Sequence, residues 1–298
     1  MDIQFIRSFG KLDLLAKQAI EGFMTGLHRS PYHGFSVEFA EHKQYNTGES
    51  TRHIDWKAFA KTDRLYTKHY EEETNLRCQC LIDISSSMFY PKENAGKITY
   101  AAYACAALSY LLHKQRDAIG LSLFHEKIVK EIPIKGTAAH LQLIFSTLEE
   151  LIATPSIEKS TAIPETLHRI AEKKYKRNLI ILFSDLLGNK DNQPAFFRAL
   201  QHLKHKNHEL IVFHIFDEKT ERNLDLENRP HRLTDLETGE KMELNPEQVK
   251  ESYQKNIKKY FHDIKILCGN YKIDFVEVDI NKPLNDLLLA YLAKRKKM

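Results

Sequence analysis

The chain has 298 residues, of which 42% are hydrophobic and 28% are charged, a composition typical of a globular protein. A net charge of +4 over this length points to neither a nucleic-acid partner nor a membrane-surface partner. The sequence has no signal peptide, no apolar run long enough to cross a bilayer and no cysteine spacing typical of zinc sites. We therefore expect a cytoplasmic protein with reduced cysteines and no membrane insertion.

The N-terminal quarter of the chain differs in character from the rest. Apolar residues recur at helical spacing over 12–24, which predicts an amphipathic helix. The polar stretch that follows contains alternating segments at 35–39 and 64–68, which predict strands of a small antiparallel unit. We therefore predict one domain at 1–76, a helix with a small β unit, and a second domain at 77–298.

Strand and helix patterns alternate throughout the second domain. The predicted strands cover residues 77–83, 118–124, 178–184, 209–216 and 272–278. The predicted helices cover residues 95–115, 138–152, 162–174, 192–206, 246–268 and 283–294. This alternation predicts an α/β fold with a doubly wound, mostly parallel sheet. Two hairpins are expected in addition, one from 118–124 with 128–134 and one within 233–244.

A carboxylate and two hydroxyls follow one another at alternate positions where the first of these strands ends. Asp83, Ser85 and Ser87 lie in the segment CQCLIDISSSM. An extended chain directs alternate side chains to one side, so these oxygens can converge on one point. Oxygen ligands suit a hard divalent cation such as Mg²⁺, held at about 2.1 Å. The alternative is an aspartate that closes a strand and a serine-rich turn that caps the next helix.

A second apolar run, RNLIILFSDLLG, also ends in a carboxylate, Asp185. In open parallel sheets, ligands bind beyond the carboxyl ends of the strands, around the topological switch point. Between the two aspartates, Thr161 precedes an amphipathic stretch. Its hydroxyl either caps that helix or reaches a neighbouring ion.

Together, Asp83, Ser85, Ser87, Thr161 and Asp185 resemble the metal-ion-dependent adhesion site of the von Willebrand factor A fold. That site consists of an Asp-x-Ser-x-Ser loop, a threonine and a later aspartate. Thr161 stands in a Lys-Ser-Thr turn rather than the usual glycine-rich turn, and the adjacent Ser160 competes for the same role. The resemblance implies that these five residues bind Mg²⁺, or Mn²⁺ or Ca²⁺ in its place.

A second resemblance is carried by Glu38, Phe39, Tyr45, Gly48, Glu49, Arg52, Ile54, Asp55, Trp56, Lys57, Arg64, Leu65, Tyr70, Glu71, the segment Asp235–Glu240 and Tyr253. With these residues, the chain is similar to the bacterial domain of unknown function family 58. This resemblance implies a MoxR-type AAA+ ATPase as partner. A cation in the predicted site keeps a position for an acidic side chain of a partner, so we expect a metal-dependent protein-binding module.

Two other functions compete with metal-dependent protein binding. The same site could be that of a metal-dependent phosphoesterase or other hydrolase, and His125 is the candidate imidazole for such a site. Alternatively, the protein is a scaffold that binds no metal. A phosphate-binding loop and a Gly-x-Ser-x-Gly elbow are both missing from the sequence, so we expect neither ATP hydrolysis nor a serine nucleophile. We interpret the segment from His202 to His208 as a solvated basic face.

Overall fold

A computed structural model gives the fold of the protein as two compact units, one of residues 24–75 and one of residues 1–23 with 76–298. The structure describes residues 12–28, 42–44, 59–60, 66–68, 76–91, 96–125, 127–153, 163–172, 178–187, 193–236 and 239–295.

In the small unit, β1 (His42–Gln44) pairs with β2 (Tyr66–Lys68) in antiparallel register, with Lys43 opposite Thr67. The strand predicted at 64–68 is therefore confirmed in part. The strand predicted at 35–39 lies outside the described residues, as do Arg52, Asp55 and Trp56.

A six-stranded sheet forms the centre of the large unit. Its strands are β3 (Arg77–Asp83), β4 (Ala118–Phe124), β5 (Ile128–Lys135), β6 (Leu179–Ser184), β7 (Glu209–Phe216) and β10 (Asp274–Asp279). They lie in the order β10-β7-β6-β3-β4-β5, and all neighbours are parallel except β4 and β5. The predicted α/β fold with a mostly parallel sheet is confirmed.

The burial of each strand follows its sequence pattern. Strands β3, β4, β6 and β7 are apolar and almost completely buried, as expected for parallel strands covered on both faces. Strand β5 alternates exposed and less exposed residues, because it lies at an edge of the sheet. The second predicted hairpin is also present, with β8 (His231–Thr234) antiparallel to β9 (Lys241–Leu244).

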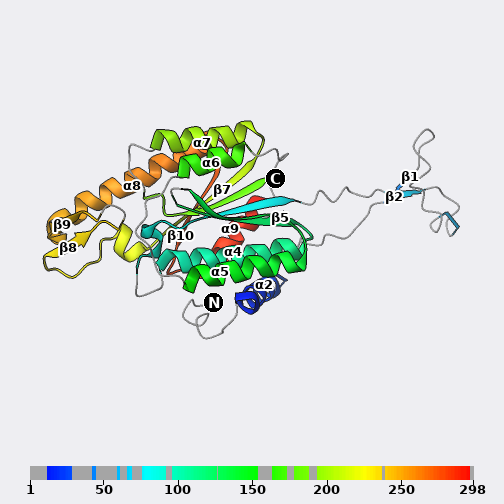
Figure 1. Ribbon diagram of the computed structural model, residues 1–298, viewed down its shortest axis with the longest axis horizontal. Helices are drawn as coiled ribbons and strands as arrows, with labels where there is room; N and C mark the ends of the chain where they lie inside the picture. Colours follow the sequence, from blue (N-terminus) through cyan, green and yellow to red (C-terminus); the bar gives the residue numbers. More distant parts are fainter. Residues whose placement is uncertain are drawn as a thin grey trace. The chain divides into compact units, whose positions relative to one another are not determined.

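Helices cover both faces of the central sheet (Figure 1). One face carries α4 (Gly96–Lys114), α5 (Ala138–Ala153) and α9 (Leu284–Arg295). The other face carries α6 (Ile163–Ala171), α7 (Gln193–His205) and α8 (Pro246–Asn270). Within the described part of the chain, no helix is both long and apolar enough to cross a membrane.

The first helix, α2 (Leu12–His28), differs in placement from the predicted domain division. Its residues up to Phe23 belong to the large unit, whereas we predicted them in one domain with the small β unit. Ile20 is fully buried, and the Leu12 amide donates a hydrogen bond to Glu149 Oε1 of α5 at 2.8 Å. An amphipathic helix needs a surface against which to bury its apolar stripe, and the large unit supplies it.

Candidate metal centre

The candidate site lies where the chain reverses its progress across the sheet. From β3 the chain continues to β4 on one side, and after β5 it returns to β6 on the other side of β3. The switch point of the sheet therefore lies between β3 and β6. Asp83 is the last residue of β3, and Asp185 directly follows the last residue of β6. These strands are parallel neighbours, with Ile82 opposite Phe183, so both carboxylates lie at the same edge.

The Asp83 carboxylate is held at both oxygens. Oδ1 accepts a hydrogen bond from the Ser85 amide at 3.0 Å, and Oδ2 accepts one from the Ser184 hydroxyl at 2.8 Å. The Ser184 oxygen in turn accepts a hydrogen bond from the Leu186 amide at 3.1 Å. Asp83 is completely buried, so its side chain has a fixed orientation at the end of the strand.

Ser85 and Ser87 lie on the turn that follows Asp83. Ser85 precedes the short 3₁₀ helix η2 (Ser86–Phe89), but its side chain makes no capping hydrogen bond there. Its hydroxyl instead lies 3.1 Å from the Ser87 hydroxyl, and Ser87 also forms a hydrogen bond with Asp185. The alternative role of Ser85, a side-chain cap of the next helix, is therefore not observed. Ser87 is half-buried and forms the more open border of the cluster.

Lys97 brings a positive charge into the cluster. Its ammonium donates a hydrogen bond to Asp185 Oδ2 at 2.7 Å and forms a second ion pair with Glu221. The side chain of Lys97 is completely buried. Asp185 Oδ1 also accepts a hydrogen bond from the Leu187 amide at 3.3 Å.

A glycine allows helix α4 to place Lys97 at this position. Gly96 has a φ of +69°, and a Cβ there would lie 2.6 Å from the carbonyl carbon of Phe89. The Gly96 amide donates a hydrogen bond to the Pro91 carbonyl at 2.9 Å, and the Lys97 amide donates one to the Tyr90 carbonyl at 3.1 Å. The helix thus begins directly against the η2 turn that carries Ser87, which only a residue without a side chain permits.

Glu221 belongs to η5 (Glu218–Arg222), a single π-helical turn that follows β7. Its Oε2 accepts a hydrogen bond from the Asp217 amide at 2.9 Å, and its carbonyl accepts one from the Tyr253 hydroxyl of α8 at 2.6 Å. Three neighbouring strands, β3, β6 and β7, therefore lead to the carboxylates of this cluster.

The charges in the cluster are not balanced. Burial and the negative charge of Asp185 raise the pKa of Asp83 to about 6. Burial also acts to raise the pKa of Asp185, but the Lys97 ammonium and hydrogen bonds to the charged form lower it below its usual value. Burial raises the pKa of Glu221, although Lys97 opposes this shift. With all three acids ionised, three negative charges and one positive charge give the cluster a net charge of −2.

This donor set fits a hard divalent cation. Two carboxylates and two hydroxyls supply only oxygen atoms, the ligands that Mg²⁺, Mn²⁺ and Ca²⁺ prefer. Burial and the charge of Asp185 raise the pKa of Asp83, and a bound cation would oppose this shift because it favours the charged form. Asp83, Ser85, Ser87 and Asp185 are the described residues that could hold it.

The structure brings together four of the five residues predicted to bind metal. Thr161 lies outside the described residues; α6 begins at Ile163. The role of all five as metal ligands stays a prediction.

Sequence reasoning missed Lys97, Ser184 and Glu221. Lys97 did leave a signal, because a lysine in the first turn of an apolar, alanine-rich helix opposes the helix dipole. Glu221 left none, since it lies in a polar segment among other charged residues.

The histidines that we considered as site residues have the following positions in the structure. His125 directly follows β4 and is buried. His202 Nδ1 lies 3.0 Å from His168 Nδ1, so that helices α7 and α6 are joined by two imidazoles. His208 is 2% exposed, and its Nδ1 accepts a hydrogen bond from the Asn178 amide at 3.2 Å. The interpretation of the segment from His202 to His208 as a solvated face is therefore wrong for His208.

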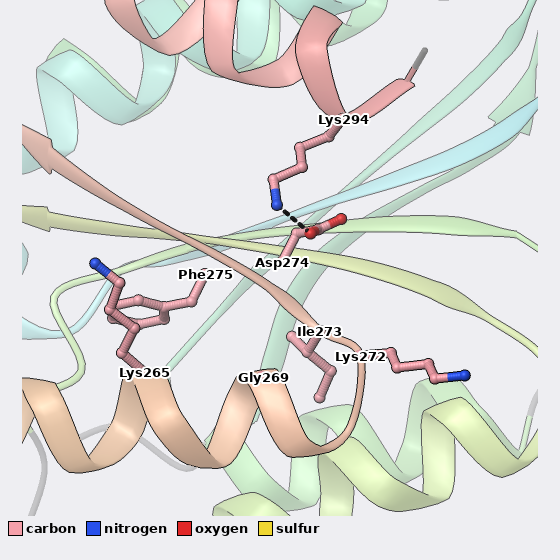
Figure 2. A pocket seen from close by; sticks show the side chains of 7 residues that line it. All are labelled: Lys265, Gly269, Lys272, Ile273, Asp274, Phe275 and Lys294. Atoms are coloured by element: carbon pink, nitrogen blue, oxygen red, sulfur yellow. Dashed lines mark hydrogen bonds and ion pairs between the residues drawn. The ribbon is translucent and has the colours of Figure 1, made fainter. Parts of the chain in front are cut away.

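A hollow of about 320 Å³ lies at the opposite edge of the sheet, where β10 begins (Figure 2). Lys294 and Asp274 form an ion pair of 2.6 Å at its rim. In Figure 2, Lys272 points away from the other two lysines. The lining residues are Lys265, Gly269, Lys272, Ile273, Asp274, Phe275 and Lys294. This hollow lies at the amino end of the strands and so takes no part in the candidate metal centre.

The sequence matches one protein family over most of its length. The model of the family described as "Protein of unknown function DUF58" matches residues 41–262. An uncharacterized protein of Mycobacterium tuberculosis is 22% identical over 207 residues, which is 69% of this chain. The match spans 63% of the length of that relative.

Solved structures with a related arrangement share little sequence with this chain. BatB from Bacteroides thetaiotaomicron, described as a conserved hypothetical protein, is 15% identical, with a TM-score of 0.45 over 75% of this chain and 100% of its own. The SpRpn10 VWA domain is 14% identical, with a TM-score of 0.38 over 71% of this chain and 92% of its own. Because both scores lie below 0.5, this likeness supports no statement about what the protein does.

Proposed function

Because this chain belongs to the DUF58 family and has two buried carboxylates at the switch point of its sheet, we propose that it is a non-catalytic, divalent-metal-dependent protein-binding module. The observation that carries the proposal is a buried cluster of oxygen donors in which the carboxylates of Asp185 and Glu221 share Lys97 and the charge of Asp185 helps to raise the pKa of Asp83.

Each residue of the cluster has a separate task in this proposal. Asp83 and Asp185 bind the cation, and the hydroxyls of Ser85 and Ser87 complete the oxygen donors, with Thr161 as the predicted fifth. The Ser85 amide and the Ser184 hydroxyl orient Asp83. When bound, Mg²⁺, Mn²⁺ or Ca²⁺ would supply an electrophilic position for an acidic side chain.

The partner in this proposal is a protein that contributes a glutamate or aspartate. The half-buried Ser87 lies on the more open side of the cluster, where such a side chain would enter. We propose a MoxR-type AAA+ ATPase as this partner, an assignment that rests on the sequence resemblance. Affinity would come mostly from the surrounding surface, because desolvation of two charged groups offsets much of their attraction.

Isothermal titration calorimetry of the purified chain with Mg²⁺ and with Mn²⁺ tests the proposal, because it measures the affinity for each cation. We expect binding to the wild type, none to Asp83→Ala, and unchanged binding to the matched control Asp274→Ala at the opposite edge of the sheet. Mg²⁺ should also raise the melting temperature of the wild type relative to EDTA, because a ligand that binds only the folded form stabilises it.

The partner is tested with a purified MoxR-type ATPase immobilised in Mg²⁺ and in EDTA. We expect the immobilised ATPase to retain the wild type in Mg²⁺ but not in EDTA, and to retain Asp83→Ala in neither buffer.

A hydrolase is the competing function. If a panel of phosphoester substrates with Mn²⁺ showed turnover by the wild type that is lost in Asp83→Ala, the non-catalytic proposal would be wrong.

A further inference from the structure

Lys97 connects the candidate metal centre to an element that contributes no predicted metal ligand. Its ammonium lies between Asp185 Oδ2, at 2.7 Å, and Glu221 of η5. The lysine side chain is completely buried and that of Glu221 is 13% exposed. Water therefore screens these ion pairs little, and a change of charge at Asp185 acts directly on Lys97.

Glu221 is in turn fixed to two other segments. Through Oε2 it accepts a hydrogen bond from the Asp217 amide, at the end of β7. Through its carbonyl it accepts one from the Tyr253 hydroxyl of α8, at 2.6 Å. A second contact with α8 runs from Gln254 Nε2 to the carbonyl of Asn223, at 2.9 Å. A shift of Glu221 therefore moves η5 and its contacts with α8.

We infer that Lys97 and Glu221 are positioning residues that couple loading of the candidate metal centre to the arrangement of η5 and α8. This inference rests on the function proposed above. The Asp185 carboxylate forms an ion pair with Lys97 in the structure. With a divalent cation between Asp83 and Asp185, the same carboxylate would have to interact with both the ammonium and the cation. The ammonium is then repelled from the centre and still attracted by Glu221, so Lys97 shifts toward Glu221 and the η5 turn follows.

The two residues have opposite effects on cation affinity. Glu221→Gln removes a negative charge and leaves Lys97 bound to Asp185 alone, so the affinity for Mg²⁺ should fall at least roughly tenfold. Lys97→Met removes the competing positive charge, so the affinity should rise by roughly the same factor. The double variant Lys97→Met/Glu221→Gln keeps the charges of Asp83 and Asp185 only. It should bind Mg²⁺ about as well as the wild type, because the net charge remains −2.

The experiment combines calorimetry with hydrogen–deuterium exchange of the full chain, with Mg²⁺ and with EDTA. In the wild type, we expect Mg²⁺ to change exchange at the amides of 218–222. The single variants and the double variant should lose this response. Glu218→Gln is the matched control, since Glu218 lies in the same turn but pairs with Arg222, and it should keep both the wild-type affinity and the wild-type response.

The outcomes separate this inference from the proposed function. If the wild type binds no cation, both are wrong. If the wild type binds Mg²⁺ but exchange at 218–222 does not change, only the coupling is wrong. The coupling is also overturned if the double variant keeps the exchange response. Glu221→Gln guards against misfolding of Lys97→Met, because it keeps the buried ion pair between Lys97 and Asp185.

Discussion

The acidic and basic side chains at the two edges of the central sheet are paired in different ways. At the amino edge, Asp117 pairs with Arg295 at 2.7 Å and Asp274 pairs with Lys294 at 2.6 Å, one basic side chain for each acid. At the carboxyl edge, Asp185 and Glu221 share Lys97, and Asp83 lies beside them with a raised pKa. Each acid of these two pairs at the amino edge has its own basic partner, whereas Asp185 and Glu221 at the carboxyl edge share one lysine.

The basic residues of the two edges also differ in their position relative to the helix dipole. Lys294 and Arg295 occupy the last turn of α9, where positive charge is favourable. Lys97 occupies the first turn of α4, where positive charge is unfavourable and no acidic residue compensates within the helix. The amino edge follows the local rules for stability, and the carboxyl edge breaks them, which is typical of functional sites.

The largest effect should follow from removing the basic residue of the carboxyl edge. Lys97→Met leaves Asp185 and Glu221 buried without a positive charge, so we expect the free energy of unfolding to fall by about 3–5 kcal/mol in EDTA. Urea denaturation measures this change. Added Mg²⁺ should recover part of the loss, because it would replace the missing positive charge beside Asp185.

An unchanged unfolding midpoint for Lys97→Met would contradict the charge balance described for this edge. Lys114→Met serves as the control for the loss of a lysine from the same helix, since Lys114 lies in its last turn and is exposed. That change should leave the unfolding free energy nearly the same.

Much of the sheet could be predicted from the sequence, because its strands are uninterrupted apolar runs between turns. The predicted bounds of β3, β4 and β7 agree with the structure. The last strand begins two residues later than predicted, at Asp274. Helix α8 runs through Gly269 and ends at Asn270, and Lys272, with a φ of +54°, turns the chain toward β10. A glycine usually marks the end of a helix, but here it lies inside one.

The candidate site was predictable only where its residues follow strand ends. Asp83, Ser85 and Ser87 alternate along an extended chain, and Asp185 ends a second apolar run, so topology brings them together. Lys97 and Glu221 lie 88 and 36 positions away from Asp185, and no periodicity connects residues at such separations. Their pairing depends on where α4 and η5 pack, which a single sequence does not specify.

The second prediction concerns Asp83, whose charge is disfavoured in the folded state. Its folded pKa of about 6 exceeds the ordinary value of 3.8, so the folded protein binds more protons than the unfolded chain between these pH values. This group therefore lowers stability as the pH rises from about 4 to about 6. In EDTA, Asp83→Asn should be more stable than the wild type by up to about 3 kcal/mol at pH 8, with little difference near pH 4.

Chemical denaturation of both proteins at several pH values tests this prediction. Glu277→Gln provides the comparison, because ion pairs with Arg222 and Lys265 outweigh the effect of burial and lower the pKa of Glu277, so its loss should destabilise the protein. If Asp83→Asn also lost stability at pH 8, the charge of Asp83 would not be disfavoured in the folded state.

The smallest effect is expected for Lys294→Ala at the rim of the hollow in Figure 2. The side chains of Lys294 and Asp274 are 36% and 30% exposed, so water and salt screen their ion pair. We expect a loss of no more than about 0.5 kcal/mol in the free energy of unfolding, and no change in Mg²⁺ affinity. Urea denaturation at low and high salt measures the first quantity and calorimetry the second. A clear gain in Mg²⁺ affinity in this variant would place the cation at the amino edge, because the loss of Lys294 removes a competing positive charge beside Asp274.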